Sequence, residues 1–421
     1  MPTPFILTLI ALLFTLNPLV FAQDEPTDVQ TCPVVPADPE LSQPDTLADY
    51  GTAIGAYLSG GGDPLALSAI LEAQGVIQAA TEDMPATGSI EVVDVTGDGF
   101  SDVLVSIWRT PSDEMPNPQT DVWFYACTDD RFELADSFTF PTPGFSPMPK
   151  LMRAVEVTGE SPAEVLFDDV QCGAHTCFSQ LNFYTWDGSA LVPLSEQSPA
   201  FPFGDYTFGT EADGSVILMV EPGFIGSVGA GPQRQSRAIY RWDGESMVME
   251  SQTFAEPEYL FQAAHDGTTA LSAEDYDSAI ESYGRVLNDD SLESFALFDD
   301  NIQRADDIVT SHAVYGQLVV FAARDGLDAA TTSDAYDRLL MLPAIPNIEE
   351  SAEAVNLWQR YGQIFYNTAL TEDDLSAACD AVLADIEATG TTEYESLMQP
   401  MYWPDFGYAN FPPEPEAACP F

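Results

Sequence analysis

One stretch of the chain decides the fold of its first half: Ile90-Glu91-Val92-Val93-Asp94-Val95-Thr96-Gly97-Asp98-Gly99-Phe100-Ser101-Asp102-Val103-Leu104-Val105-Ser106-Ile107-Trp108. Two runs rich in β-branched residues, 90–95 and 103–108, flank a turn rich in Asp and Gly. This pattern is typical of two antiparallel strands joined by a tight connection. The period of two continues from about residue 88 to 255, so we expect an antiparallel β domain over 88–255.

Oxygen-bearing side chains alternate along the turn between these two runs, at Asp94, Thr96, Asp98 and Asp102. They match positions 1, 3, 5 and 9 of a calcium-binding loop, with Gly99 at position 6 and the carbonyl of Phe100 at position 7. Three carboxylates so close together repel one another unless a cation neutralises them, so we expect a structural Ca²⁺ ion here. The alternative is a β-turn without an ion. Val105 replaces the usual Glu at position 12, so the flanks are strands and not EF-hand helices.

The pattern recurs further along the chain. Val155–Glu160 matches Val93–Asp98 at an offset of 62 residues (156 − 94), and Phe183–Gly188 matches Ile239–Gly244 at an offset of 56 residues (242 − 186). A repeat of about 60 residues with four strands per unit is typical of propeller-like blades. Because only three copies are visible, we expect three consecutive antiparallel sheets or an open propeller segment, capped by helices.

The motif from Asp94 to Asp102 resembles the FG-GAP and VCBS repeats of integrin-like propellers and secreted bacterial proteins. The resemblance implies a loop that binds Ca²⁺ and blades that serve adhesion or ligand binding. The complete motif occurs once. A second copy, Glu156–Glu164, keeps carboxylates at positions 1, 5 and 9 but has Ser161 in place of the glycine, which weakens the case for a metal there. A third copy, Thr210–Ser215, is degenerate.

Helical periodicity precedes the β domain, over residues 46–87. A first short helix is indicated by apolar residues at helical spacing, Leu47, Tyr50, Ile54 and Leu58. Asp63-Pro64 has the form of an N-cap followed by a proline at the first helical position. The second helix is expected to turn inward Leu65, Ala69, Ile70 and Ile77.

Helical composition returns over 257–398. A set of small and aromatic residues, Ala263, Gly267, Ala279, Tyr283 and Val286, resembles the spacing of tetratricopeptide repeats. The small residues let paired helices approach, and the aromatic residue fills the space between them. The resemblance covers about 257–390 and implies a helical scaffold for protein or peptide contact. We therefore predict an α+β multidomain protein: a propeller-blade-like β-repeat domain, then an all-α helical-repeat domain, then a tail over 399–421.

The first 22 residues have the features of a signal peptide. They carry no charged side chain, Phe5–Leu16 is an apolar run, and small residues precede the expected cleavage after Ala22. An uncleaved anchor is the alternative. Residues 23–45, rich in Pro and acidic residues, are expected to form an extended, mobile linker. No later stretch approaches 18 apolar residues, so we expect no membrane insertion after cleavage and a secreted or extracytoplasmic location in the cell envelope of a bacterium.

An even number of cysteines in an exported chain indicates disulfides. The chain has six, which allow 15 connectivities. We favour three pairs: Cys172 with Cys177 as a local loop, Cys379 with Cys419, and Cys32 with Cys127. For Cys172, His175 and Cys177 the alternative is zinc, but a structural zinc site needs a fourth ligand and none lies nearby in the sequence.

The charge balance of the chain limits its partners. Twelve basic residues stand against 68 acidic ones, a formal charge of −56. Such a chain is repelled by phosphate backbones and anionic lipid, so we expect no nucleic-acid partner and a preference for cations. The chain has three His and no G-x-S-x-G element, and we favour the view that it is not an enzyme. Our leading hypothesis is an exported binding or scaffold protein for an unknown protein, peptide or glycan. The alternatives are a glycan hydrolase that uses carboxylates and a structural envelope protein.

Overall fold

The computed structural model describes residues 30–295, 302–342 and 351–390 and Cys419, except for short gaps at 36, 38, 82–85, 110–117, 142–145, 148, 160–161, 174–175, 212–213 and 227–230. The expected signal peptide, the first part of the expected linker and most of the expected tail lie outside the described residues. His175 and Ser161 lie outside them as well.

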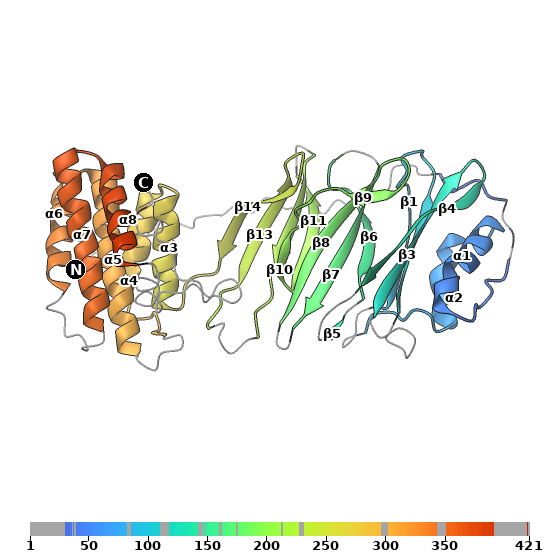
Figure 1. Cartoon of the computed structure of the whole chain (residues 1–421), viewed down its shortest axis with the longest axis horizontal. Helices are drawn as coiled ribbons and strands as arrows, with labels where there is room; N and C mark the ends of the chain where they lie inside the picture. Colours follow the sequence, from blue (N-terminus) through green and yellow to red (C-terminus); the bar gives the residue numbers. More distant parts are fainter. Residues whose placement is uncertain are drawn as a thin grey trace, which may run out of the picture.

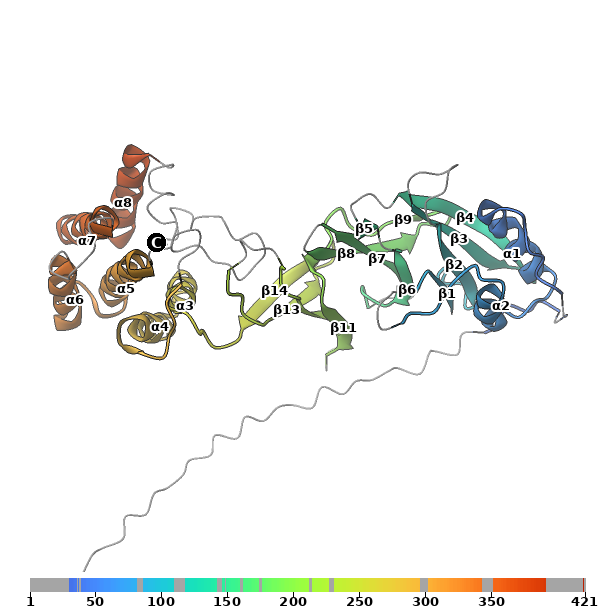
Figure 2. The same ribbon diagram turned by 90° about the horizontal axis from the view of Figure 1, so that it is seen from below.

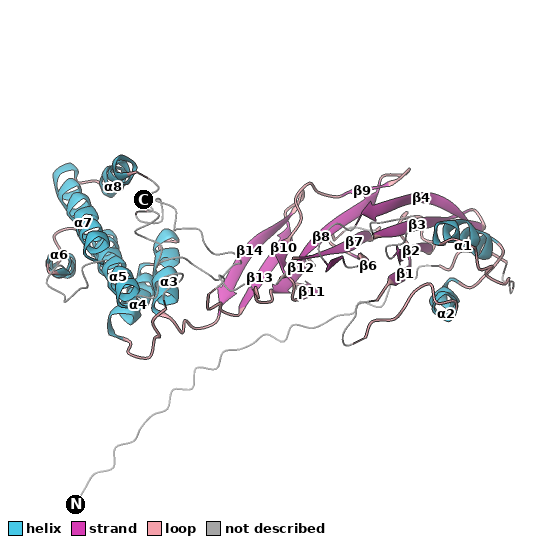
Figure 3. Cartoon of the chain, turned by 60° about the horizontal axis from the view of Figure 1, so that its bottom comes forward, coloured by secondary structure: helices cyan, strands magenta, loops and turns pink. Residues whose placement is uncertain are grey.

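The molecule is elongated, with helices at both ends and antiparallel sheets between them (Figure 1). Figure 3 shows the strands in magenta between the cyan helices of the two ends. This confirms the predicted α+β class and the expected three consecutive antiparallel sheets. The propeller-like and repeat interpretations stay predictions.

A helical cap begins the described fold. It consists of the 3-10 turn η1 (Leu47–Asp49), helix α1 (Tyr50–Ser59), the 3-10 turn η2 (Pro64–Ala66) and helix α2 (Leu67–Ala73). Tyr50, Ile54 and Leu58 are buried in α1, and Asp63 accepts a hydrogen bond from the Leu65 amide, both as the sequence predicts. The predicted inward face of the second helix is partly correct: Ile77 is buried and Ile70 packs against the core, whereas Leu65 is 76% exposed and Ala69 is exposed. Leu65 lies in the 3-10 turn before α2, and the buried residues of α2 are Leu67 and Leu71.

Each of the three sheets contains a four-stranded antiparallel meander. The first holds β1 (Gly88–Val93), β2 (Asp102–Arg109), β3 (Gln119–Thr128) and β4 (Arg131–Pro141). The second holds β6 (Leu151–Val155), β7 (Glu164–Cys172), β8 (Cys177–Trp186) and β9 (Leu191–Pro193), with β5 (Ser146–Pro147) beside β7 and β10 (Ala200–Pro202) beside β8. The third holds β11 (Asp205–Thr210), β12 (Val216–Glu221), β13 (Ser236–Trp242) and β14 (Met247–Phe254).

The sheets are held together by apolar cores on both of their faces. On β2, Val103 and Val105 belong to the core under α1 and α2, whereas Leu104 belongs to the core between the first and second sheets. A strand that is buried on both faces reads as a continuous apolar run, which explains the sequence of 103–108. A further core, which includes Leu166 and Leu218, lies between the second and third sheets.

Two equivalent hairpins mark the second and third sheets. Trp186 ends β8 and Trp242 ends β13, and the carboxylate of the next residue, Asp187 or Asp243, accepts two backbone N–H bonds in the turn. Both tryptophans pack against the cores between sheets, and the Trp186 ring meets the edge of Phe124 with centroids 5.1 Å apart.

In the described residues, six helices follow the sheets. They are α3 (Leu260–Ser272), α4 (Tyr276–Asn288), α5 (Ile302–Asp325), α6 (Ala330–Leu340), α7 (Ala352–Glu372) and α8 (Leu375–Thr389), and Figure 2 shows them arranged around α5. The switch from strands to helices thus falls between Phe254 and Leu260, close to the predicted boundary. Among the described residues, no helix is both long enough and apolar enough to cross a membrane.

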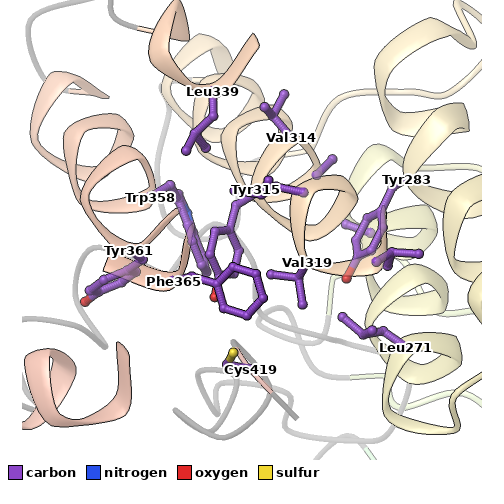
Figure 4. Close-up of a cluster of buried hydrophobic side chains, with 14 of the residues drawn as sticks. Leu271, Tyr283, Val314, Tyr315, Val319, Leu339, Trp358, Tyr361, Phe365 and Cys419 are labelled. Atoms are coloured by element: carbon purple, nitrogen blue, oxygen red, sulfur yellow. The ribbon is translucent and has the colours of Figure 1, made fainter. Parts of the chain in front are cut away.

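Close helix contacts in this region depend on glycine. A Cβ added at Gly267 of α3 or at Gly316 of α5 would come within 2.7 or 2.4 Å of the Tyr283 ring, which is 1% exposed. A Cβ at Gly362 of α7 would likewise lie 2.2 Å from Leu339 of α6. Figure 4 shows Tyr283, Leu339 and their aromatic neighbours in this core. The predicted contact of Gly267 with Tyr283 is present, and the tetratricopeptide interpretation stays a prediction.

The three disulfides join the pairs favoured from the sequence: Cys32–Cys127, Cys172–Cys177 and Cys379–Cys419. The first ties the expected linker to β3, and Leu41 of that segment is 4% exposed. The described part of the expected mobile linker is therefore fixed at Cys32 and at Leu41, while Val35 between them is 81% exposed. Because Cys172 and Cys177 are bonded to each other, neither supplies a thiolate for zinc.

Candidate cation-binding loop

The predicted calcium motif forms the connection from β1 to β2 at one end of the first sheet. Its backbone turns through Gly97 (φ 78°) and Gly99 (φ 89°), in the left-handed region that favours glycine. Pro162 of the equivalent connection in the second sheet lies 3.3 Å from the place where a Cβ of Gly97 would sit. The two connections therefore touch.

Asp94 and Asp98 fold the loop around their own carboxylates. Asp94 Oδ1 accepts a hydrogen bond from the Gly97 amide at 2.7 Å, and its Oδ2 accepts one from the Gly99 amide at 2.9 Å. Asp98 Oδ1 accepts the Phe100 amide at 2.8 Å. Asp98 is exposed and Asp94 is half-buried. A carboxylate has about four acceptor sites, so both groups can accept further bonds.

Asp102 has a different role from the other two carboxylates. It is fully buried, and its Oδ2 accepts the amides of Val95 and Thr96, both at 2.9 Å. Its Oδ1 accepts the Cys127 amide of β3 at 2.8 Å. Desolvation raises the pKa of Asp102, and the three amide donors act in the opposite direction. Asp102 thus braces the loop against the sheet.

The donor chemistry of the loop fits a hard divalent cation. The oxygens of the predicted site that lie outside the sheet are the carboxylates of Asp94 and Asp98 and the Phe100 carbonyl. The Thr96 hydroxyl is buried and interacts with the Asp102 carboxylate. Oxygen donors with two negative charges suit Ca²⁺ better than softer metals. The part of the chain that the structure describes brings together no group of three or more His, Cys, Asp or Glu side chains placed to hold a metal. The Ca²⁺ site therefore stays a prediction that depends on two carboxylates.

The equivalent connection in the second sheet also has a buried acid at the last position of the motif. Glu164, the first residue of β7, is 3% exposed, and its Oε2 accepts the Val157 amide at 2.8 Å. Its Oε1 accepts the Thr158 hydroxyl at 2.7 Å. Glu164 thus takes the place of Asp102, because each acid binds the amide seven residues before it. In the third copy, Thr210–Ser215, part of the turn lies outside the described residues.

Sequence reasoning missed one participant in the site. Gln30 forms a short parallel bridge with Phe100, and its amide donates to the Gly99 carbonyl at 3.0 Å. The Ser101 amide in turn donates to the Gln30 carbonyl at 2.8 Å. No periodicity or motif marks Gln30, and the only local signal is that Cys32 follows it closely.

Other buried carboxylates form ion pairs or hydrogen bonds with neighbouring side chains. Three pairs show this: Asp121 with Arg109 (3.0 Å), Asp169 with Lys150 (2.6 Å) and Asp168 with the Tyr206 hydroxyl (3.1 Å). The Arg153 guanidinium lies 4.6 Å from the centre of the Tyr206 ring. These groups lie between or against the sheets, where they fix the packing.

The helical region has an open hollow of about 600 Å³ where the α5–α6 and α7–α8 connections meet. Four carboxylates and three leucines line it: Asp325, Asp328, Asp373, Asp374, Leu327, Leu370 and Leu375. Asp325 is paired with Arg324 at 2.8 Å, and Asp374 caps α8. The hollow is acidic and partly apolar.

The described histidines lie away from both places. His312 of α5 is buried against Trp358, with ring centroids 4.8 Å apart, and desolvation lowers the pKa of His312 to about 3. The ring of His265 in α3 lies against that of Phe254, with centroids 6.3 Å apart. Both contacts are those of packing residues.

Comparison with known proteins adds no relative. No protein-family model matches the chain, and no curated protein or solved structure matches it. The function is therefore inferred from the chemistry of the residues described above.

Proposed function

We propose that this protein is an exported, non-enzymatic binding scaffold whose first sheet is stabilised by Ca²⁺ at the loop from Asp94 to Asp102. The helical region supplies the surface for a protein or peptide partner. The FG-GAP-like and tetratricopeptide-like interpretations of the sequence belong to this proposal. The three disulfides fit an extracytoplasmic location.

One observation carries the proposal. The described buried carboxylates of the β domain are engaged by groups of the sheets, whereas Asp94 and Asp98 lie on a surface loop and accept only backbone amides of that loop. Most of the 12 basic side chains are already paired with acids, so the remaining charge of the chain favours cation binding.

Calorimetry with and without Ca²⁺ tests this proposal. We expect the melting temperature to rise with Ca²⁺, because a ligand at one hundred times its Kd stabilises the folded state by about 2.7 kcal/mol. The increase should disappear in the double variant Asp94→Asn/Asp98→Asn.

The matched control is Asp187→Asn/Asp243→Asn, which removes the same charge from two exposed turns of the other sheets. This control variant should show the same rise in melting temperature with Ca²⁺ as the wild-type protein. A melting temperature that does not respond to Ca²⁺ or EDTA in the wild-type protein contradicts the calcium site. Turnover of a glycan that is abolished by one Asp or Glu substitution contradicts the non-enzymatic role.

A further inference from the structure

The chain passes from the third sheet to the helical region through residues 255–259, between β14 and α3 (Figure 1). A short connection of this kind allows two regions to move relative to each other unless further contacts prevent it. In this protein the connection is bonded at both ends. The Ala255 amide donates to the Gln235 carbonyl at 2.8 Å, and the amides of the last two residues of the connection donate to Gln262 Oε1 at 2.9 and 3.2 Å.

An arginine of the β domain reaches across this connection to the first helix. Arg234, which lies just before β13, donates two hydrogen bonds to the two carboxylate oxygens of Asp266 in α3, both at 2.9 Å. It also donates to the Ala255 carbonyl at 3.4 Å, and its guanidinium lies 4.7 Å from the centre of the Phe254 ring. One side chain therefore contacts the last residue of β14, the connection and α3.

Burial distinguishes this ion pair from the exposed pairs of the same sheet. The side chain of Arg234 is 3% exposed and that of Asp266 32%, whereas Arg237 and its partner Glu221 are 57% and 50% exposed. Exposed pairs contribute little to stability, but a bidentate pair between arginine and a carboxylate fixes the geometry of both groups. Removal of one partner of a buried pair leaves the other charge uncompensated. The Arg234 pair is therefore the stronger constraint.

A second contact lies on the same face of α3. Gln262 and Asp266 are four residues apart and so point to the same side of the helix. Gln262 Nε2 donates to the Pro232 carbonyl at 3.3 Å. Gln233 attaches the same segment to the β domain, because its side chain forms two hydrogen bonds with the backbone of Ile225, at 2.9 and 3.0 Å. The segment before β13 thus bridges the third sheet and α3.

We propose that Arg234 fixes the orientation of the helical region relative to the three sheets, so that the two regions move as one rigid body. Domain hinges are a few loop residues that absorb large changes in backbone angles. Here the residues that would serve as a hinge are bonded to both regions. The proposal goes beyond the binding role and does not rest on the Ca²⁺ site.

Small-angle X-ray scattering and hydrogen exchange on the full chain test this proposal. We expect the scattering of the wild-type protein to fit one elongated arrangement and that of Arg234→Ala to require several orientations of the helical region. The Ala255 amide should exchange about tenfold faster in Arg234→Ala, as the loss of bonds to a charged group requires. Amides of β12 should keep their exchange rates, which shows that the third sheet stays folded.

The matched control is Arg237→Ala, which removes an exposed arginine whose ion pair lies within the third sheet. It should leave both the scattering and the exchange of Ala255 unchanged. If Arg234→Ala does not fold, Asp266→Ala replaces it as the test, because that side chain is more exposed and its loss removes the same contact from the helix side.

The double variant Arg234→Ala/Asp266→Ala shows whether the two residues act through one contact. We expect it to be no more flexible than Arg234→Ala alone, because partners in one contact give non-additive effects. Wild-type scattering together with unchanged Ala255 exchange in both single variants overturns the proposal. Additive effects of the two substitutions, or an equal effect of Arg237→Ala, overturn it as well.

Discussion

Asp98 and Asp102 belong to one nine-residue motif but lie in opposite surroundings. Asp98 is exposed and accepts one amide, whereas Asp102 is fully buried and accepts three. A buried amide that loses its acceptor costs about 1 to 3 kcal/mol, because its desolvation is no longer compensated. Residues of the same type in the same motif therefore differ widely in their contribution to stability.

The substitution Asp102→Asn tests this difference. Its Nδ2 would face the amides of Val95 or Cys127, donor against donor, so we expect a loss of about 3 kcal/mol or more in the free energy of unfolding. Asp98→Asn is the matched control and should cost less than about 1 kcal/mol. Urea unfolding in EDTA separates this effect from metal binding, and equal losses in the two variants would contradict the bracing role.

His312 makes stability depend on pH. The unfolded chain binds a proton at the ordinary pKa of about 6.5, whereas burial lowers the pKa of His312 in the folded protein to about 3. The unfolded state therefore binds more protons between these values, and stability falls as the pH falls from about 6.5 towards 3.

The variant His312→Gln removes this one titration. We expect the free energy of unfolding of the wild-type protein to fall about 1.4 kcal/mol more per pH unit than that of His312→Gln between pH 6 and 4. Urea unfolding at a series of pH values measures both slopes. Parallel slopes for wild type and His312→Gln would show that His312 stays protonated or accessible.

At the scale of elements, one aromatic ring of the helical region packs between two glycines of neighbouring helices. Tyr283 of α4 lies against Gly267 of α3 and Gly316 of α5, and its hydroxyl is 3.2 Å from the Thr268 hydroxyl. A side chain at either glycine forces the ring or a helix to move. Overpacking of this kind typically costs about 1 to 3 kcal/mol.

Substitution of these glycines by alanine tests the close approach. We expect Gly267→Ala and Gly316→Ala each to lower the free energy of unfolding by about 1 to 3 kcal/mol. Gly284→Ala on α4 is the matched control, because nothing lies within 4 Å of its added Cβ. It should be neutral or stabilise the helix by up to about 1 kcal/mol. Thermal or urea unfolding ranks the three variants, and equal effects would point to helix propensity alone.

At the scale of the whole molecule, the disulfides differ in how much chain they close. Cys32–Cys127 spans 95 residues and fixes the N-terminal segment to the first sheet. Cys172–Cys177 spans five residues at the end of one hairpin. In the chain-entropy model, the longer loop restricts the unfolded state more strongly.

Pairwise replacement by serine tests this order. Cys32→Ser/Cys127→Ser should lower the free energy of unfolding by about 4 to 5 kcal/mol, and Cys172→Ser/Cys177→Ser by about 2 kcal/mol. Denaturant unfolding without reductant gives both values. The reverse order would mean that native-state packing and not chain entropy decides what each disulfide contributes.

The sequence predicts well those features that depend on neighbours along the chain. The period of two over 88–255, the helical composition after 257 and the Asp-Gly turns after Trp186 and Trp242 are local patterns, and the strands, helices and turns follow them. The favoured disulfides follow from an even count and plausible partners. The positions of Leu65 and Ala69 were predicted wrongly because a 3-10 turn, Pro64–Ala66, precedes α2 and the buried residues of α2 are Leu67 and Leu71.

Only the tertiary structure decided the contacts between residues that are distant in the sequence. Asp102 turns inward because the Cys127 amide of β3 is there to receive it, and Gln30 docks on Ser101 across 71 residues. Gly316 approaches Tyr283 because α5 packs back on α4. The sequence by itself determined the elements and the oxygen-rich loop, since backbone preference and local hydrogen bonds act over a few residues. The roles of the individual carboxylates were decided by burial and by which amides the folded chain brings to them.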